Sequence, residues 1–336
     1  MRLHRLPKPG DIDNLTLAEA DVPRPGARQV LVRMRAASLN YRDLAIIRGQ
    51  YVMGPLPDDL VPLSDGAGEV VEIGAGVTRV RVGDRVAGIF MQSWLGGEME
   101  AEHGLSALGG ALHGVLAEYR VFDQDGLVHV PAHLSFEEGA TLPCAAVTVW
   151  NALYGLKPLL PGQTVLTLGT GGVSMFALQF AHAAGARVIS TSSSDEKLER
   201  ARALGANDTI NYRTHEDWHG SVRELTGGRG VDHVVEVGGP GTLMRSILST
   251  RIGGVVSLIG ILSFAEINPL PILGGAVIVR GVLVGNRQMF EDMNRAVALH
   301  QIRPVIDRVF PFEDARAAYH HLAGAMHVGK VVIGIG

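Results

Sequence analysis

Three glycines stand close together where an apolar run ends and a helical pattern begins, in the sequence Gly169-Thr-Gly171-Gly172-Val173-Ser174. The run before them, Val165–Leu168, is typical of a short buried strand, and Val173–Ala184 has the composition of an apolar helix. Glycines at such a turn permit a sharp bend and let a pyrophosphate approach the free N–H groups that begin a helix. The spacing predicts a dinucleotide-binding loop, with a tight turn that binds nothing as the alternative.

The next strand ends in a hydroxyl-rich stretch, Thr191-Ser192-Ser193-Ser194, which is followed by Lys197. Proteins that select NAD place a carboxylate about 20 residues after the glycines, where it binds the ribose 2′-hydroxyl. A 2′-phosphate instead favours hydroxyl groups, which donate hydrogen bonds to it, and a cation, which attracts it. A carboxylate at the same position would repel the phosphate. The stretch therefore predicts NADP(H), and Asp195 is interpreted as the N-cap or first turn of the following helix. A serine-rich loop that only caps this helix is the alternative.

The elements that position these loops change character near residue 130. Before it, short alternating runs punctuated by Gly and Pro predict a compact, mainly β unit. After it, strands alternate with helices up to residue 284, which is typical of a doubly wound parallel sheet. Two helices, at 290–300 and 312–323, and a closing strand are expected to return to the first unit. The sequence thus predicts an α/β protein with domains at 1–128, 129–284 and 285–336.

Composition excludes several classes of protein. Of the 336 residues, 46% are apolar and 19% are charged, and the net charge is −4. Disorder and a basic nucleic-acid-binding surface are therefore not expected. The chain has no apolar run of the roughly 18 residues that a membrane-spanning helix needs, and its N-terminus lacks the apolar segment of a signal peptide. A cytoplasmic protein with neither nucleic-acid nor membrane partners is expected.

Motifs along nearly the whole chain resemble the medium-chain dehydrogenase/reductase superfamily, and most of all its zinc-free branch, which includes quinone oxidoreductases and zinc-type alcohol dehydrogenase-like proteins. The motifs are Asn40-Tyr-Arg-Asp43, Ser64-Asp-Gly-Ala-Gly-Glu-Val, Val82-Gly-Asp-Arg-Val, Gly114-Val-Leu-Ala-Glu-Tyr, Leu142-Pro-Cys-Ala-Ala, Gly169-Thr-Gly-Gly-Val, Ile210-Asn-Tyr and His327-Val-Gly-Lys-Val-Val. The resemblance implies a GroES-like catalytic domain and a Rossmann domain that binds NADP(H), with the active site in the cleft between them. It also implies a homodimer. The branched run 276–284 offers a sheet edge for pairing, unless it is an interior strand.

The resemblance further implies which residues bind the cofactor. The pyrophosphate loop contributes Gly169, Gly171, Gly172 and Val173, and the 2′-phosphate and adenine end is held by Ser192, Ser193, Ser194, Lys197 and Tyr212. The residues expected beside the nicotinamide and along the phosphate path are Asn40, Asp43, Thr148, Gly238, Ile259, Gly260, Ile261, Gly285, Asn286 and Lys330.

A metal site is not expected. Zinc-dependent relatives hold the ion with Cys, His and Cys, whereas Asn40 and Ser64 stand at the first two of these positions and only Cys144 matches the third. A single thiol does not hold a tetrahedral zinc ion alone, and Cys144, the one cysteine, is interpreted as a small buried apolar residue. The adjacent His320 and His321 would point in different directions on a helix, so they do not suggest a ligand pair.

Hydride transfer without a metal still needs an acceptor carbon over the nicotinamide and a group that offsets the charge developing on oxygen. An enone or quinone delocalises part of that charge. Tyr41 and Arg42 are the predicted catalytic residues, with Tyr51 and His113 as further hydrogen-bond candidates. A packing role for Tyr41 and a proton taken from water are the alternatives. The irregular 90–114 loop is expected near the mouth of the site.

These observations predict a zinc-independent, NADP(H)-dependent oxidoreductase that transfers a hydride between NADPH and a small carbonyl, enone or quinone substrate. Two enzymatic alternatives remain, a zinc-free alcohol dehydrogenase and an enoyl reductase that acts on thioesters. A non-catalytic NADPH-binding sensor or scaffold is the alternative from a different class, because binding alone needs the same cofactor loop.

Overall fold

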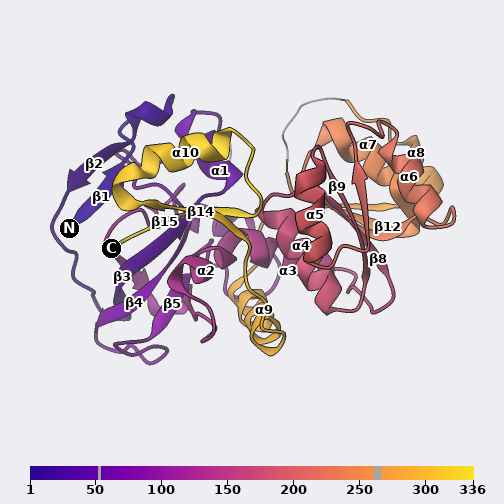
Figure 1. Cartoon of the computed structure of the whole chain (residues 1–336). Helices are drawn as coiled ribbons and strands as arrows, with labels where there is room; N and C mark the ends of the chain where they lie inside the picture. The colour runs from indigo at the N-terminus through magenta and orange to yellow at the C-terminus, as the bar shows by residue number, and fades with distance from the viewer. Residues whose placement is uncertain (52–53, 261–265) are drawn as a thin grey trace. The chain divides into compact units, whose positions relative to one another are not determined.

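The chain forms two compact units in the computed structural model, which describes residues 1–51, 54–260 and 266–336 (Figure 1). Unit 1 comprises Met1–Val147 and Gly285–Gly336, and unit 2 comprises Thr148–Val284. Both ends of the chain therefore belong to unit 1. No helix in the described ranges is both long enough and apolar enough to cross a membrane.

Unit 1 is built on a mainly antiparallel sheet. In its described part the order is β14-β15-β3-β4-β5-β7, and β6 also pairs with β3. The strands are β3 (Gln29–Ser38), β4 (Asp65–Ile73), β5 (Arg85–Gly88), β6 (Tyr119–Asp123), β7 (Leu127–His129), β14 (Ile306–Pro311) and β15 (Lys330–Gly334), and β1 (Arg2–Arg5) pairs separately with β2 (Thr16–Glu19). The helices that concern the site are α1 (Tyr41–Ile47), α2 (Phe136–Ala140), α9 (Arg287–Leu299) and α10 (Ala315–Ala323).

The core of unit 1 joins segments from both ends of the chain. Val32 and Met34 of β3 and Ile47 of α1 are buried in one cluster with Tyr319 of α10 and Val331 of β15. The alternation of β3 supplies the apolar side chains on its inner face, as a half-buried strand requires. The C-terminal segment is therefore part of the framework that holds α1 in place.

Unit 2 is a doubly wound sheet whose described strands run parallel in the order β10-β9-β8-β11-β12-β13. The strands are β8 (Thr164–Leu168), β9 (Arg187–Ser192), β10 (Asp208–Asn211), β11 (Val231–Glu236), β12 (Thr250–Leu258) and β13 (Ile278–Gly281). The helices are α3 (Val147–Tyr154, whose first residue belongs to unit 1), α4 (Gly172–Ala183), α5 (Asp195–Ala203), α6 (Trp218–Leu225), α7 (Pro240–Ser249) and α8 (Leu270–Gly275). The predicted α/β fold class is thereby confirmed.

The run 276–284 is shorter as a strand than its composition suggests. Only Ile278–Gly281 forms β13, and it is the last strand in the order of the described sheet, with β12 as its neighbour. The interpretation of this run as an interior strand is therefore wrong. Its branched side chains differ in burial: Val277, Val282 and Val284 are buried, whereas Ile278 keeps 40% of its surface accessible.

The side chain of His233 is buried in the sheet of unit 2. It lies on β11 between Val165 and Val255 of the flanking strands, and it is only 2% exposed. Neither ring nitrogen has a hydrogen-bond partner among the described residues. Burial lowers the pKa of His233 from 6.5 to about 4, because a charged imidazole would lose its hydration there.

We expect the stability of the protein to fall on acidification because of His233. In the unfolded chain, the His233 imidazole binds a proton as the pH falls below its ordinary pKa of 6.5. In the folded chain, it binds that proton only near pH 4, because its pKa there is about 4. The free energy of unfolding should therefore drop by about 2 kcal/mol between about pH 7 and pH 5 through this group. Urea unfolding at both pH values should show a smaller drop for His233→Val. An equal drop in the variant and the parent protein would contradict the assignment.

Candidate active site

Predicted cofactor residues gather at the carboxyl edge of the unit 2 sheet. Gly169 follows β8, Ser192 ends β9, Tyr212 follows β10, Gly238 follows β11 and Ile259 follows β12. The chain fills the sheet outward in both directions from the neighbouring strands β8 and β11. Ligands of open parallel sheets bind at such a switch point, outside the carboxyl ends of the strands. The structure therefore brings these five residues to one edge of one sheet.

The glycine loop has the strand-to-helix geometry that the sequence predicts. Gly169 adopts φ = +70°, a region that favours glycine, and its N–H donates to the carbonyl of Thr191 (2.8 Å). Gly171 is the N-cap of α4, and a Cβ on it would meet no described atom within 4 Å. The buried Ser174 hydroxyl donates to the carbonyl of Leu168 (2.6 Å) and closes the turn. Backbone conformation explains Gly169 and a hydrogen bond explains Ser174, whereas neither requires glycine at position 171.

The hydroxyl-rich stretch lies at the end of β9, beside the end of the neighbouring strand β10. Ser194 is the N-cap of α5, where its hydroxyl accepts a hydrogen bond from the Lys197 N–H (3.4 Å), and Asp195 is the first residue of that helix. The interpretation of Asp195 as a helix-start residue is confirmed. The N–H of Tyr212 donates to the carbonyl of Ser192 (3.0 Å), so the two ends lie side by side. Of these serines, Ser194 has a capping role in its own right, whereas Ser192 and Ser193 do not cap α5.

Glu236, at the end of β11, fixes the loop that follows it. Its buried carboxylate accepts hydrogen bonds from the N–H groups of Gly238 (2.7 Å) and Gly239 (3.1 Å), and from the hydroxyls of Thr242 (2.6 Å) and Ser246. Such bonds satisfy a carboxylate that would otherwise be costly to bury. Glu236 is absent from the residues that the sequence predicts, although a carboxylate placed directly before Val-Gly-Gly-Pro is a visible signal.

The backbone of Glu236 also reaches the loop after β12. Its carbonyl accepts the N–H groups of Ile259 (2.8 Å) and Gly260 (3.3 Å), and a Cβ on Gly260 would lie 2.0 Å from the carbonyl oxygen of Val237. The two loops are therefore in contact, and Gly260 is needed for their close approach. Ile261 lies outside the described residues.

In unit 1, a chain of hydrogen bonds joins Asn40, Ser64 and Cys144. By the family resemblance, these are the positions at which zinc-dependent relatives carry their zinc ligands. Lys330 Nζ donates to Asn40 Oδ1 (2.5 Å), and Asn40 Nδ2 donates to Ser64 Oγ (3.5 Å). Ser64 Oγ donates to Asp65 Oδ1 (2.7 Å), and the Cys144 N–H donates to Asp65 Oδ2 (3.1 Å). We refer to these five residues as the polar centre. They come from four separate segments of the chain, and Asp65, the member that the sequence does not predict, connects Ser64 with Cys144.

Burial controls the protonation of the polar centre and its surroundings. Asp65 is fully buried, which raises its pKa, and the charge of Lys330 offsets part of this effect. Burial also raises the pKa of Asp43 to about 7, while Arg42 and the Asn40 N–H act in the opposite direction. The pKa of the Cys144 thiol is raised by burial and by Asp65, so the nucleophilic thiolate is disfavoured.

The predicted catalytic residues fall into two groups. Tyr41 begins α1 and keeps 52% of its surface accessible, so its phenol is available to a ligand. The Arg42 guanidinium instead packs on the rings of Phe90 (4.5 Å) and Tyr51 (5.1 Å), and its Nη1 donates to the carbonyl of Leu108 (2.9 Å). Arg42 thus contacts the 90–114 loop, whereas Tyr51 contacts the Arg42 guanidinium, whose Nε and Nη2 are buried without a hydrogen-bond partner among the described residues.

The remaining predicted residues of unit 1 are mostly buried. His113 Nδ1 accepts a hydrogen bond from the N–H of Val61 (3.2 Å). The pKa of His113 is lowered mainly by burial and further by the positive charge of Arg120. Gly285 packs tightly, since a Cβ there would lie 2.7 Å from a methyl carbon of Val147. Asn286 is the N-cap of α9 and is 4% exposed. In unit 2, Thr148 is buried in α3, and Gly172 and Val173 form the first turn of α4.

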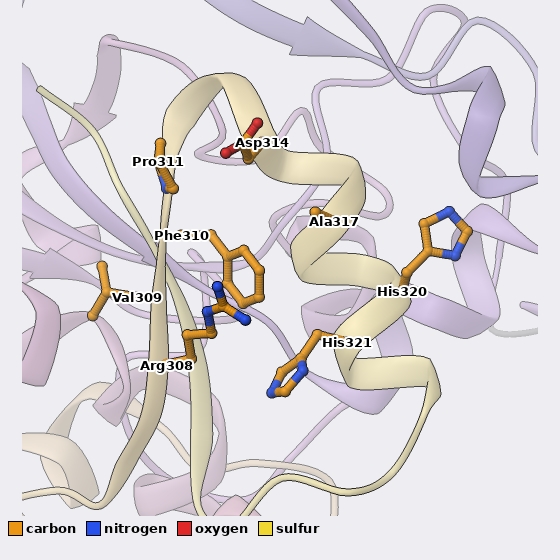
Figure 2. Close-up of a pocket in the computed structure, with 8 residues that line it drawn as sticks. All are labelled: Arg308, Val309, Phe310, Pro311, Asp314, Ala317, His320 and His321. Atoms are coloured by element: carbon orange, nitrogen blue, oxygen red, sulfur yellow. The ribbon is translucent and has the colours of Figure 1, made fainter.

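A surface pocket of unit 1 shares no residue with the predicted site. This cavity of about 460 Å³ between β14 and α10 is lined by Arg308, Val309, Phe310, Pro311, Asp314, Ala317, His320 and His321 (Figure 2). His320 and His321 point in different directions from α10, and His321 contacts Asp307 (2.8 Å). Across the described part of the chain, no group of three or more His, Cys, Asp and Glu side chains is placed to hold a metal ion.

Two family models match the chain. Residues 26–132 match the alcohol dehydrogenase GroES-like domain, and residues 172–299 match the zinc-binding dehydrogenase domain. A zinc-type alcohol dehydrogenase-like protein of Schizosaccharomyces pombe is 46% identical over 334 residues, which cover 96% of each chain. A quinone oxidoreductase of Pseudomonas aeruginosa is 32% identical over 322 residues, which cover 92% of each chain.

Solved structures agree with these matches over nearly the full length. A protein of Sinorhizobium meliloti assigned as an alcohol dehydrogenase superposes with a TM-score of 0.92 at 42% identity, covering 99% of this chain and 98% of its own. A structure described as an NAD-dependent alcohol dehydrogenase gives a TM-score of 0.90 at 33% identity, with both chains fully covered.

Proposed function

This chain belongs to the medium-chain dehydrogenase/reductase superfamily, as an oxidoreductase of the alcohol dehydrogenase and quinone oxidoreductase type, and from that premise we propose its reaction. The protein transfers a hydride between NADPH and a small carbonyl, enone or quinone, without a zinc ion. The observation that carries this proposal is the convergence of the glycine loop and four neighbouring loops at the carboxyl edge of the unit 2 sheet.

The residues present fit a nicotinamide dinucleotide. The space beside Gly171, where a Cβ would meet no described atom, suits a phosphate at the N-terminus of α4. Ser192, Ser193 and Lys197 suit a 2′-phosphate, and Tyr212 lies beside them. Bound NADPH would supply the hydride.

The polar centre supports a mechanism without zinc. Asn40 and Ser64 offer an amide and a hydroxyl, which are bonded to each other, where a zinc site would need thiolate, imidazole or carboxylate ligands. A conjugated substrate needs less charge stabilisation at oxygen than a simple ketone does. We assign the hydrogen bond to that oxygen to Tyr41, whose phenol is exposed at the start of α1.

We also propose a homodimer formed at the side of β13 that faces away from β12, where no described strand pairs with it. A strand at a sheet edge presents unpaired N–H and C=O groups that a second copy can match. Exposed apolar side chains lie in this part of the chain, namely Leu270 and Leu273 of α8 (66% and 79% exposed), Ile278 (40%) and Leu283 (45%). Burial of these side chains would add a hydrophobic contribution to the pairing.

The cofactor preference can be measured by titration, following nicotinamide fluorescence. We expect NADPH to bind at least about tenfold more tightly than NADH. Lys197→Glu should remove this preference by repelling the 2′-phosphate, while Lys8→Glu, on the surface of unit 1, serves as the charge-matched control. Equal binding of both cofactors would show that the serine-rich stretch does not select a 2′-phosphate. Binding of neither would refute the proposed function.

Turnover with NADPH and a panel of enones, quinones, simple ketones and enoyl thioesters tests the reaction itself. We expect Tyr41→Phe to lower kcat/KM by about 100-fold and to leave the NADPH Kd unchanged. Tyr119→Phe, on β6, is the matched control. An unchanged kcat/KM in Tyr41→Phe would exclude Tyr41 as the donor. NADPH binding without turnover of any substrate would favour a sensor or scaffold.

Sedimentation velocity can test the proposed dimer. The chain mass is 35.7 kDa, so the parent protein should sediment as a species of twice this mass. Leu273→Lys combined with Ile278→Lys should give a monomer, because charges at the edge oppose pairing. Leu299→Lys, at an equally exposed leucine of unit 1, should leave the dimer intact. A monomeric parent protein would contradict the proposal.

A further inference from the structure

The 90–114 loop is docked on the beginning of α9. The N–H groups of Arg287 and Gln288, in the first turn of that helix, donate to the carbonyls of Trp94 (3.0 Å) and Leu95 (3.2 Å). The first N–H groups of a helix have no partners within the helix itself. Here the loop supplies two of these partners, so its central part and the start of α9 are held together by backbone contacts.

Asn286 completes this junction with both ends of its amide. Its Oδ1 accepts the N–H of Met289 (2.9 Å), as an N-cap does, and its Nδ2 donates to the carbonyl of Gly97 (3.2 Å). The same carbonyl accepts the indole N–H of Trp94 (3.2 Å). Asn286 and Trp94 are 4% and 3% exposed. An asparagine can serve as acceptor and donor together, whereas aspartate has no donor for Gly97, and the serine hydroxyl is one bond shorter than the amide nitrogen.

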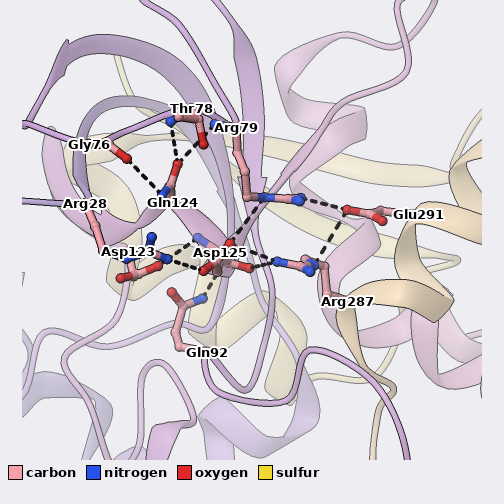
Figure 3. A network of polar contacts seen from close by, with 11 residues as sticks. Arg28, Gly76, Thr78, Arg79, Gln92, Asp123, Gln124, Asp125, Arg287 and Glu291 are labelled. Carbon is pink, nitrogen blue, oxygen red and sulfur yellow. Dashed lines mark hydrogen bonds and ion pairs between the residues drawn. The ribbon is translucent and has the colours of Figure 1, made fainter.

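The helix that carries this junction is itself fixed to the sheet of unit 1 (Figure 3). Arg287 Nη1 donates to the carbonyl (3.0 Å) and the carboxylate (3.3 Å) of Asp125, and Glu291 accepts from Arg79 (2.8 Å). Gln92, near the start of the loop, donates to the carbonyl of the residue after Asp125 (3.2 Å). Loop and helix are thus attached to the same turn, which leaves the 94–97 segment with a fixed position.

The loop is also anchored at its two ends by Arg42. The guanidinium packs on Phe90 at the start of the loop and donates to Leu108 near its end. Within the loop, Trp94 stacks on His103, with ring centroids 6.0 Å apart and planes 21° apart. A loop held by contacts of this kind has a defined conformation, and the loss of any one of these contacts would change that conformation.

We propose that Asn286 is a positioning residue for substrate selection, which acts by holding Gly97 and thereby the 94–97 segment of the loop. The inference rests on the proposed function and on the prediction from the sequence that the 90–114 loop lies near the mouth of the site. It gives Asn286 a task different from the cofactor contact that the family resemblance implies, because both ends of its amide are bound within unit 1. Release of Gly97 would widen the set of loop positions and weaken the fit of a small substrate.

The test compares Asn286→Ser with the parent protein, since serine keeps an N-cap acceptor and its hydroxyl is one bond shorter than the amide nitrogen that reaches Gly97. Hydrogen exchange measured by mass spectrometry should become about tenfold faster in peptides within 92–106 and should stay unchanged in the rest of α9. The KM for the substrate should rise about fivefold, the effect of one lost hydrogen bond, with kcat and the NADPH Kd within about twofold of the parent values. Asn294→Ser is the matched control, because Asn294 also lies on α9 and donates to a carbonyl, that of His129 (3.0 Å).

Each outcome separates this inference from the proposed function. Unchanged loop exchange in Asn286→Ser would overturn the role of Asn286, whatever the activity. Faster exchange with an unchanged KM would overturn the link to substrate selection and leave the proposed reaction standing. If the parent protein turns over no substrate, the proposed function fails, and the exchange data still decide whether Asn286 holds the loop.

Discussion

Pairing of the last strand, β15, with β3 is the constraint on which the polar centre depends. The two strands run antiparallel with Val332 opposite Ser38, and β4 pairs on the other side of β3 with Asp65 opposite the same serine. Lys330 begins β15 and Asn40 follows β3, so the ammonium meets the amide only because these strands are neighbours. A register shift of one residue would turn Lys330 to the other face of the sheet.

Buried carboxylates organise both units, but different partners make their burial tolerable. Asp65 lies near the ammonium of Lys330 and accepts bonds from a hydroxyl and a backbone N–H. Glu236 is surrounded by two backbone N–H groups and two hydroxyls, with no cation among these partners. A buried charge that loses its partners costs roughly several kcal/mol. Each carboxylate therefore disfavours any geometry in which the loops around it no longer supply these partners. The hydrogen bonds of these two buried carboxylates therefore determine the conformation of the loops that carry the predicted ligand contacts.

The 90–114 loop shows how irregular chain acquires a fixed shape. Its length alone suggests either function or mobility. Its anchors come from distant segments: Arg42 on α1, and Asn286 and the backbone of Arg287 on α9. Two of these side chains are predicted ligand contacts from their motifs, yet both ends of the Asn286 amide are engaged within unit 1, and Arg42 uses its Nη1 to hold Leu108. A residue type and its motif thus indicate the neighbourhood of a site more reliably than they indicate the contact each side chain makes.

The sequence by itself determined the features that depend on neighbouring residues: the strand–glycine–helix turn at Gly169, the helix start at Asp195, and the alternation of strands and helices that defines the α/β fold. These features follow from local backbone preferences and apolar periodicity, which a short window contains. Only the tertiary structure decided that Asp65 links Ser64 with Cys144, and that Asn286 holds Gly97. Such contacts join residues far apart in the chain, and no local pattern records which donor meets which acceptor after the strands have paired.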